Sequence, residues 1–146
     1  MSQSNARTHA AVTADPIDFD AVTARVGDDT VGAVVSFRGI VRDHDNGRGV
    51  SGIDYSNHPD AEVILTRLAT EIAEREDVTA VAIEHRVGHL DVGEDAMVVA
   101  VAASHRAGAF KGCFDLVNEV KAQVPIWKNQ EFTDGGTEWT GLPAQD

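Results

Sequence analysis

The stretch DAMVVAVAASHRAGAFKGCFDLVNEVKAQVPIWKNQEF, residues 95–132, decides the fold, because it reads as strand, helix and strand in succession. Residues 95–104 are almost entirely apolar, which is typical of a central strand. Residues 107–124 repeat apolar side chains at helical spacing and predict a helix. Pro125 has no backbone N–H and cannot continue that helix, so residues 126–132 are predicted to form the next strand.

Two long amphipathic helices are expected. The side chains of the helix at 107–124 that should face the core are Phe110, Cys113, Phe114, Val117 and Val120. A helix over residues 58–77 should bury Ala61, Ile64, Leu65, Leu68 and Ile72, which share one face at 3.6-residue spacing. A shorter helix is predicted over residues 15–27, with Pro16 near its first turn and Gly27 as its stop.

Further strands are predicted where β-branched residues alternate, at residues 30–41, 50–56, 78–88 and 137–141. Short turns join neighbouring strands, so the order α-β-β-α-β-β-α-β-β predicts an α+β fold with a largely antiparallel sheet. We expect residues 1–15 to be a flexible polar arm and residues 16–146 to be one domain.

The composition of the chain excludes several classes of partner and structure. The net charge of −12 disfavours nucleic acid as a partner, and no apolar run is long enough to cross a membrane. The one cysteine, Cys113, excludes an internal disulfide framework and fits a reducing cytoplasm. It lies on the apolar face of a predicted helix, so we expect a buried, inert thiol.

Cations at a predicted helix start indicate an anion site. In SHRAGAF, residues 104–110, Ser104 ends a strand, and His105 and Arg106 stand where unpaired N–H groups and the positive end of the helix dipole favour a phosphate or carboxylate. The alternative is that Ser104 caps the helix while His105 and Arg106 face solvent.

A second cation follows the strand in FRGIVRDH, residues 37–44. Gly39 suggests a bulge, and Arg42 at the edge of the following loop is placed to reach an anion. Pairing of Arg42 with Asp43 or Asp45 in solvent is the alternative.

The chain holds three lysines, and two of them, Lys121 and Lys128, flank Pro125. The sharp turn at Pro125 can bring a helix end and a strand together, and two neighbouring ammonium groups would lower the pKa of at least one amine. The alternatives are a cation favoured by the helix dipole at Lys121 and a charge protecting an edge strand at Lys128.

No metal site is predicted. His85 and His89 have the spacing of zinc ligands, but Gly88 interrupts the segment and the sequence offers no evident third ligand.

Four stretches together resemble one family, the large, catalytic subunit of molybdopterin synthase, and cover about residues 30–132. They are GAVVSFRGIVRDHD (32–45), EHRVGHLDVGE (84–94), VVAVAASHRAGAF (98–110) and KAQVPIWK (121–128).

The resemblance implies an α/β hammerhead fold and a sulfurtransferase. The family converts cyclic pyranopterin monophosphate into molybdopterin, taking sulfur from the C-terminal thiocarboxylate of a small ubiquitin-like carrier that ends in Gly-Gly. It uses no metal or redox cofactor at this step, and it forms a central homodimer with a carrier at each end. No ubiquitin-like segment is evident in the sequence, so we expect the carrier to be a separate protein.

By the same resemblance, the active-site lysines of the family fall on Lys121 and Lys128. Its substrate-binding residues for the pterin phosphate fall on Arg42, His105 and Arg106, some of which would reach across the dimer.

The sequence departs from the family at one position. The acidic residue that commonly stands two places after the second lysine is Gln130 here, and Glu131 follows it. A catalytically silent relative that only binds the carrier or a pterin is therefore the alternative function.

Overall fold

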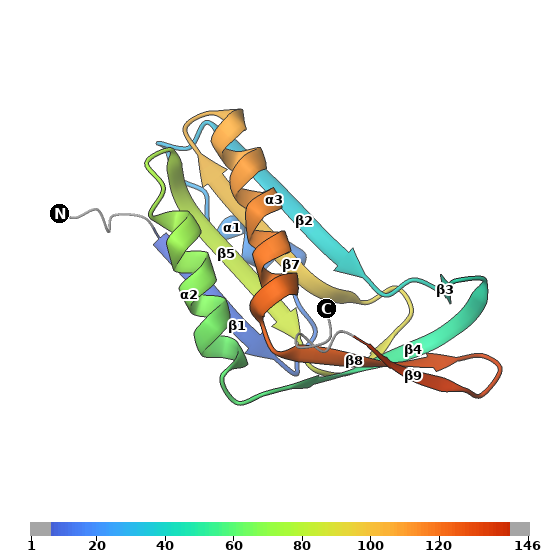
Figure 1. Ribbon diagram of the computed structural model, residues 1–146. Coiled ribbons are helices and arrows are strands. Elements are labelled where there is room, and N and C mark those ends of the chain that lie inside the picture. The colour runs from blue at the N-terminus through green and yellow to red at the C-terminus, as the bar shows by residue number, and fades with distance from the viewer. Residues whose placement is uncertain (1–6, 141–146) are drawn as a thin grey trace.

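The computed structural model describes residues 7–140, which form an α+β fold of two sheets and three helices (Figure 1). The elements are β1 (Arg7–Thr13), α1 (Phe19–Ala24), β2 (Ala33–Ile40), β3 (His44–Asp45), β4 (Arg48–Asn57), α2 (Ala61–Ala73), β5 (Val78–Arg86), β6 (Gly88–Asp91), β7 (Asp95–Ala103), α3 (Arg106–Gln123), β8 (Ile126–Phe132) and β9 (Thr137–Thr140). Within the described residues, no helix has the length and apolarity needed to span a membrane.

The first sheet has the strand order β1-β5-β7-β2 and is covered on both faces. Helices α2 and α3 lie side by side on one face, and α1 lies on the other (Figure 1). The central strands β5 and β7 are almost wholly buried, as their apolar sequences predict. Burial of these strands and of the inner faces of α2 and α3 supplies the main core.

The predicted flexible arm is wrong for residues 7–13, which form β1, while residues 1–6 lie outside the described part of the chain. Strand β1 pairs in parallel with β5 from Arg7 opposite Ala80 to Thr13 opposite Arg86. The other pairings of this sheet are antiparallel, in agreement with the predicted sheet type.

The second sheet has the strand order β3-β4-β8-β9, and β6 also pairs with β4. Strand β6 was not among the predicted strands, and it lies in the connection between the predicted strands at 78–88 and 95–104. A small separate core lies beneath this sheet and consists of Val41, Val50, Ile53, Leu90, Ala96 and Phe132.

The loop expected after the strand at residues 30–41 contains a tight β-hairpin between β3 and β4. Its two turn residues, Asn46 and Gly47, both have positive φ angles, 50° and 79°. A turn with two positive φ angles matches the twist of antiparallel strands, and Asn-Gly is the pair that adopts it most readily. The hairpin fixes Asp45 opposite Arg48 and points its side chain toward β8.

Helix α3 follows the prediction in extent but not in its apolar face. Cys113 and Val120 are buried and Val117 is partly buried, as expected. Phe110 and Phe114 are instead 62% and 67% exposed. Small residues, including Gly112, bring the buried face of α3 against the sheet: a Cβ added at Gly112 would lie 3.1 Å from Val101. The two phenylalanines lie on the other face of the helix.

Candidate active site

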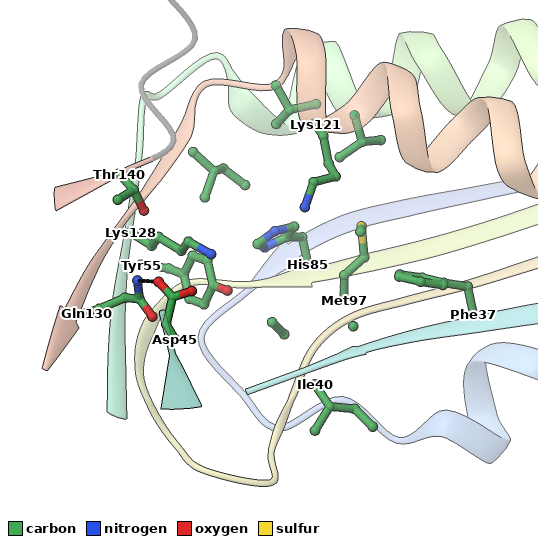
Figure 2. Close-up of a pocket in the computed structure, with 15 residues that line it drawn as sticks. Phe37, Ile40, Asp45, Tyr55, His85, Met97, Lys121, Lys128, Gln130 and Thr140 are labelled. Carbon is green, nitrogen blue, oxygen red and sulfur yellow. Dashed lines mark hydrogen bonds between the residues drawn. The ribbon is translucent and has the colours of Figure 1, made fainter. Parts of the chain in front are cut away.

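A pocket of about 490 Å³ lies where the C-terminal end of α3 meets the second sheet (Figure 2). Helix α3, strands β4, β5, β7 and β8, and the segment from β2 to β3 all contribute side chains to it. The residues that matter chemically are Asp45, Tyr55, His85, Lys121, Lys128 and Gln130, and the apolar wall includes Phe37, Ile40, Met97, Val120 and Ile126.

The predicted convergence of the two lysines is confirmed, because Lys121 and Lys128 line the same pocket. Lys121 descends from the last turn of α3 and Lys128 extends from β8, and both amines point into the cavity (Figure 2). Burial and the neighbouring Lys121 ammonium lower the pKa of Lys128, and the Asp45 carboxylate partly opposes this. The pocket therefore holds two cations at close range, one of them half-buried.

Lys128→Met is expected to raise the free energy of unfolding at pH 7, because the folded protein keeps a charged amine in a half-buried site beside another cation. A lowered pKa means that the folded protein binds this proton less tightly than the unfolded chain does. The penalty is fully present below the folded pKa and disappears as pH rises toward the unfolded value of about 10.4. Urea unfolding at pH 7 and pH 10 should show that the gain shrinks; a less stable variant at pH 7 would contradict this.

His85, which the sequence reading treated only as a rejected zinc ligand, is buried at the base of the pocket. Its Nδ1–H donates to the backbone carbonyl of Arg86 at 2.8 Å, which leaves Nε2 as an acceptor. Burial lowers the pKa of His85 and keeps the ring neutral at pH 7. The ring of Tyr55 packs edge-on against it, with centroids 5.3 Å apart. His85 and Tyr55 are thus polar pocket residues that the sequence reading missed.

Arg42 pairs with Asp45, which was the alternative to an anion-binding role in the sequence analysis. Its Nη2 donates to Asp45 Oδ1 at 3.3 Å, and its side chain is largely exposed. Arg42 nevertheless lines a small side pocket together with Asp45, Lys128 and Gln130, so it stands beside the two lysines. The predicted bulge is present where the register of β2 shifts between Gly39 and Ile40.

His105 and Arg106 lie far from the lysines within one chain. Both are exposed, and the N-cap of α3 is His105 rather than Ser104, with no side-chain capping bond. Lys121 is fifteen residues further along the same helix, about 22 Å at 1.5 Å per residue. One chain therefore places Lys121, Lys128 and Arg42 together and leaves His105 and Arg106 at the opposite end of α3.

His89 occupies a separate cluster on the second sheet. Donor atoms of Asp54, His89 and Glu131 lie within 4.8 Å of one another. Hydrogen bonds account for the arrangement, because the two ring nitrogens of His89 bond to Asp54 at 3.0 Å and to Asp91 at 3.1 Å. The carboxylates raise the pKa of His89, which favours an imidazolium over a metal ligand. Cys113 is buried as predicted, and burial raises the pKa of its thiol to about 11.

Comparisons with known proteins agree on one family. The model of the family described as "MoaE protein" matches residues 12–123. The molybdopterin synthase catalytic subunit of Bacillus subtilis is 34% identical over 131 residues, which are 89% of this chain and 83% of that protein. The Aspergillus fumigatus protein of the same name is 43% identical over 109 residues, 74% of this chain. The match spans only 58% of that fungal relative's length.

Solved structures share the fold. Molybdopterin synthase from Staphylococcus aureus superposes with a TM-score of 0.82 at 30% identity, covering 88% of this chain and 94% of that one. A Helicobacter pylori structure, described as a complex of subunits 1 and 2 of molybdopterin-converting factor, superposes at 0.67 with 17% identity, covering 90% of this chain and 87% of that one. The family match and the relatives lead to one conclusion: the chain belongs to the MoaE family, that of the molybdopterin synthase catalytic subunit.

Proposed function

We propose that this chain is the catalytic subunit of a molybdopterin synthase and transfers sulfur from a carrier thiocarboxylate to cyclic pyranopterin monophosphate. The observation that carries the proposal is the pocket with the amines of Lys121 and Lys128 together in a strongly acidic protein. Both reactants are anionic, and positive groups in a partly dry pocket attract them more strongly than they would in open solvent. The apolar wall beside the lysines suits the flat pterin ring.

The proposed role of the two lysines is to stabilise the negative charge that forms during sulfur transfer. The thiocarboxylate sulfur bonds to a side-chain carbon of the cyclic pterin phosphate, and the carbon–oxygen bond at that carbon breaks, so that the oxygen leaves as a phosphate oxygen or as water. Water then attacks the acyl carbon of the carrier, and the carbon–sulfur bond of the acyl group breaks. That attack creates a tetrahedral oxyanion, whose collapse leaves sulfur on the pterin and a carboxylate on the carrier. We assign Lys121 to the reacting acyl group and Lys128 to orienting and neutralising the charge that develops.

A second copy of the chain is needed to complete the site. A two-fold axis across α3 would set two such helices antiparallel and bring His105 and Arg106 of one copy beside the lysine pocket of the other. An exposed apolar surface supports this: Phe110 and Phe114 project from α3, and Phe37 lies on the neighbouring edge strand β2. We therefore propose a homodimer that packs through α3 and β2, with His105 and Arg106 holding the substrate phosphate in trans.

The second partner is a separate small ubiquitin-like carrier whose Gly-Gly tail enters the pocket. A carrier on each catalytic subunit gives a heterotetramer. We expect one catalytic domain in this chain, a cytoplasmic location, and no nucleic acid or membrane among its partners.

The test is conversion of cyclic pyranopterin monophosphate by the purified chain with a thiocarboxylated carrier, followed by mass spectrometry of the pterin product. We expect a dithiolene that contains two sulfur atoms, with two carriers hydrolysed for each pterin. A chain that binds the carrier and the pterin but forms no dithiolene would instead be the catalytically silent relative.

Arg42→Ala and Arg106→Ala are expected to weaken pterin binding more than turnover. Each arginine would contribute a charge-assisted bond to the phosphate, so we expect KM to rise about tenfold with a smaller change in kcat. Arg75→Ala is the matched control, because Arg75 pairs with Asp115 away from the pocket. Unchanged pterin affinity in both variants would contradict the proposal that these arginines bind the substrate phosphate.

A further inference from the structure

Asp45 is the one carboxylate among the described residues that line the lysine pocket. It comes from the β3–β4 hairpin, far in sequence from the helix and strand that carry the lysines. Both of its oxygens are engaged: Oδ2 accepts from Gln130 Nε2 at 2.9 Å and Oδ1 accepts from Arg42 Nη2 at 3.3 Å. Figure 2 shows the Asp45–Gln130 bond beside the amine of Lys128.

The side chain of Gln130 is buried and held in one position by its surroundings. Only 5% of its surface is exposed, and it lies two residues after Lys128 on β8, so both side chains project from the same face of the strand. A buried amide donor must be hydrogen-bonded, and its partner here is the Asp45 carboxylate. The bond ties the hairpin that carries Asp45 to the strand that carries Lys128.

We propose that Asp45, held by Gln130, is the positioning residue of the lysine pocket. Its negative charge stands among the cations of the pocket, where it directs the Lys128 side chain into the cavity and orients Arg42 at the pocket edge. The hairpin supplies the carboxylate of this pocket, and the Gln130 amide holds it in position. In this role Asp45 acts through Lys128 and Arg42 rather than on the reactants themselves.

The groups that face Lys128 support this assignment. Lys121 on α3 and Arg42 before β3 are both cationic and disfavour a second ammonium, and burial acts in the same direction. Tyr55 and the neutral His85 add no charge at pH 7. Among the described residues around the pocket, Asp45 alone opposes the loss of the Lys128 proton.

The test exchanges the acid and the amide. Asp45→Asn keeps the shape but removes the charge, and we expect the pKa of Lys128 to fall and kcat/KM to drop about tenfold. Gln130→Glu places two carboxylates in contact, which we expect to impair turnover by repulsion. The double variant D45N/Q130E restores one acid and one amide in exchanged positions. We expect its kcat/KM to recover to within about threefold of wild type.

Two readouts separate the outcomes. Because the chain has three lysines, ¹³C-lysine labelling gives few side-chain signals, and the pKa of Lys128 is read directly even in an inactive variant. Asp54→Asn is the matched control: Asp54 is also on the second sheet, next to Tyr55 in sequence, but does not line the pocket. We expect no change in that variant.

An unchanged Lys128 pKa in Asp45→Asn, or a double variant no better than the worse single variant, would overturn the assignment. The kinetic readout rests on the proposed function, and the pKa readout does not. An inactive wild-type protein would refute the proposed function alone. An active wild-type protein whose Asp45→Asn variant keeps the same kcat/KM and the same Lys128 pKa would refute this inference alone.

Discussion

Replacing Lys121 by alanine is expected to lower the rate of dithiolene formation by about 10³-fold or more, the loss typical when a donor to a developing oxyanion is removed. Its amine enters the pocket from the last turn of α3, opposite the amine of Lys128. Without it, the negative charge that forms when water attacks the acyl carbon has one ammonium fewer to stabilise it. Single-turnover conversion of the pterin with thiocarboxylated carrier measures the effect.

The fold should survive this substitution, because Lys121 is exposed at a helix end. Thermal unfolding of the variant is therefore expected to match wild type closely. Lys111→Ala is the control: Lys111 lies on the same helix and pairs with Asp115 at 3.2 Å, outside the pocket. A Lys121→Ala protein that turns over at the wild-type rate would remove Lys121 from the mechanism.

Mixed dimers are expected to recover activity from two impaired chains. If Arg106 acts across the dimer, a dimer of one Lys121→Ala chain and one Arg106→Ala chain contains one site with both residues intact. Two affinity tags isolate the mixed dimer, and its rate should be about half that of wild type at low pterin concentration, because one of two symmetric sites is complete. Each homodimeric variant should be far slower under the same conditions.

The matched control pairs Lys121→Ala with Lys128→Ala. These two lysines line the same pocket of one chain, so neither site of that mixed dimer is complete and no recovery is expected. Recovery in the first pair alone would place Arg106 opposite the lysines in trans. Equal inactivity of both pairs would contradict the antiparallel dimer, although the pocket of each chain would stand.

What the sequence predicted well depends on short-range chemistry. Pro125 has to end a helix, so the turn between Lys121 and Lys128 and their convergence could be expected from a few residues. The buried strands β5 and β7 are apolar enough to be recognised by themselves. The repeated Leu and Ile positions of α2 likewise predict its buried face.

What the sequence did not predict depends on long-range packing. Residues 7–13 are polar at their start, and only pairing with β5 makes them a strand. Helix α3 turns Phe110 and Phe114 outward because small residues such as Gly112 occupy its tight contact with the sheet. Asp45 reaches Gln130 across 85 positions of sequence. The Asn46-Gly47 turn was the available signal for that hairpin.

The charges of the pocket come from separate segments, so local patterns could indicate each cation but not their arrangement. Arg42, Lys121 and Lys128 meet in one chain, while His105 and Arg106 stand at the far end of α3. A phosphate site made of all five requires two copies. The predicted helix over residues 107–124 already implied that separation, because the distance follows from the length of one helix. The sequence could not show which of the other cations lie beside the lysines.

The most direct test of the lysine pocket follows the three lysine side chains by NMR while a carrier is added. The carrier with its C-terminal Gly-Gly should shift the signals of Lys121 and Lys128, and pterin should shift them further. Lys111, exposed and paired with Asp115, should not respond. A carrier lacking the two glycines should leave all three signals in place. If the intact carrier binds and leaves Lys121 and Lys128 unshifted, its tail does not enter this pocket and the proposed mechanism is wrong.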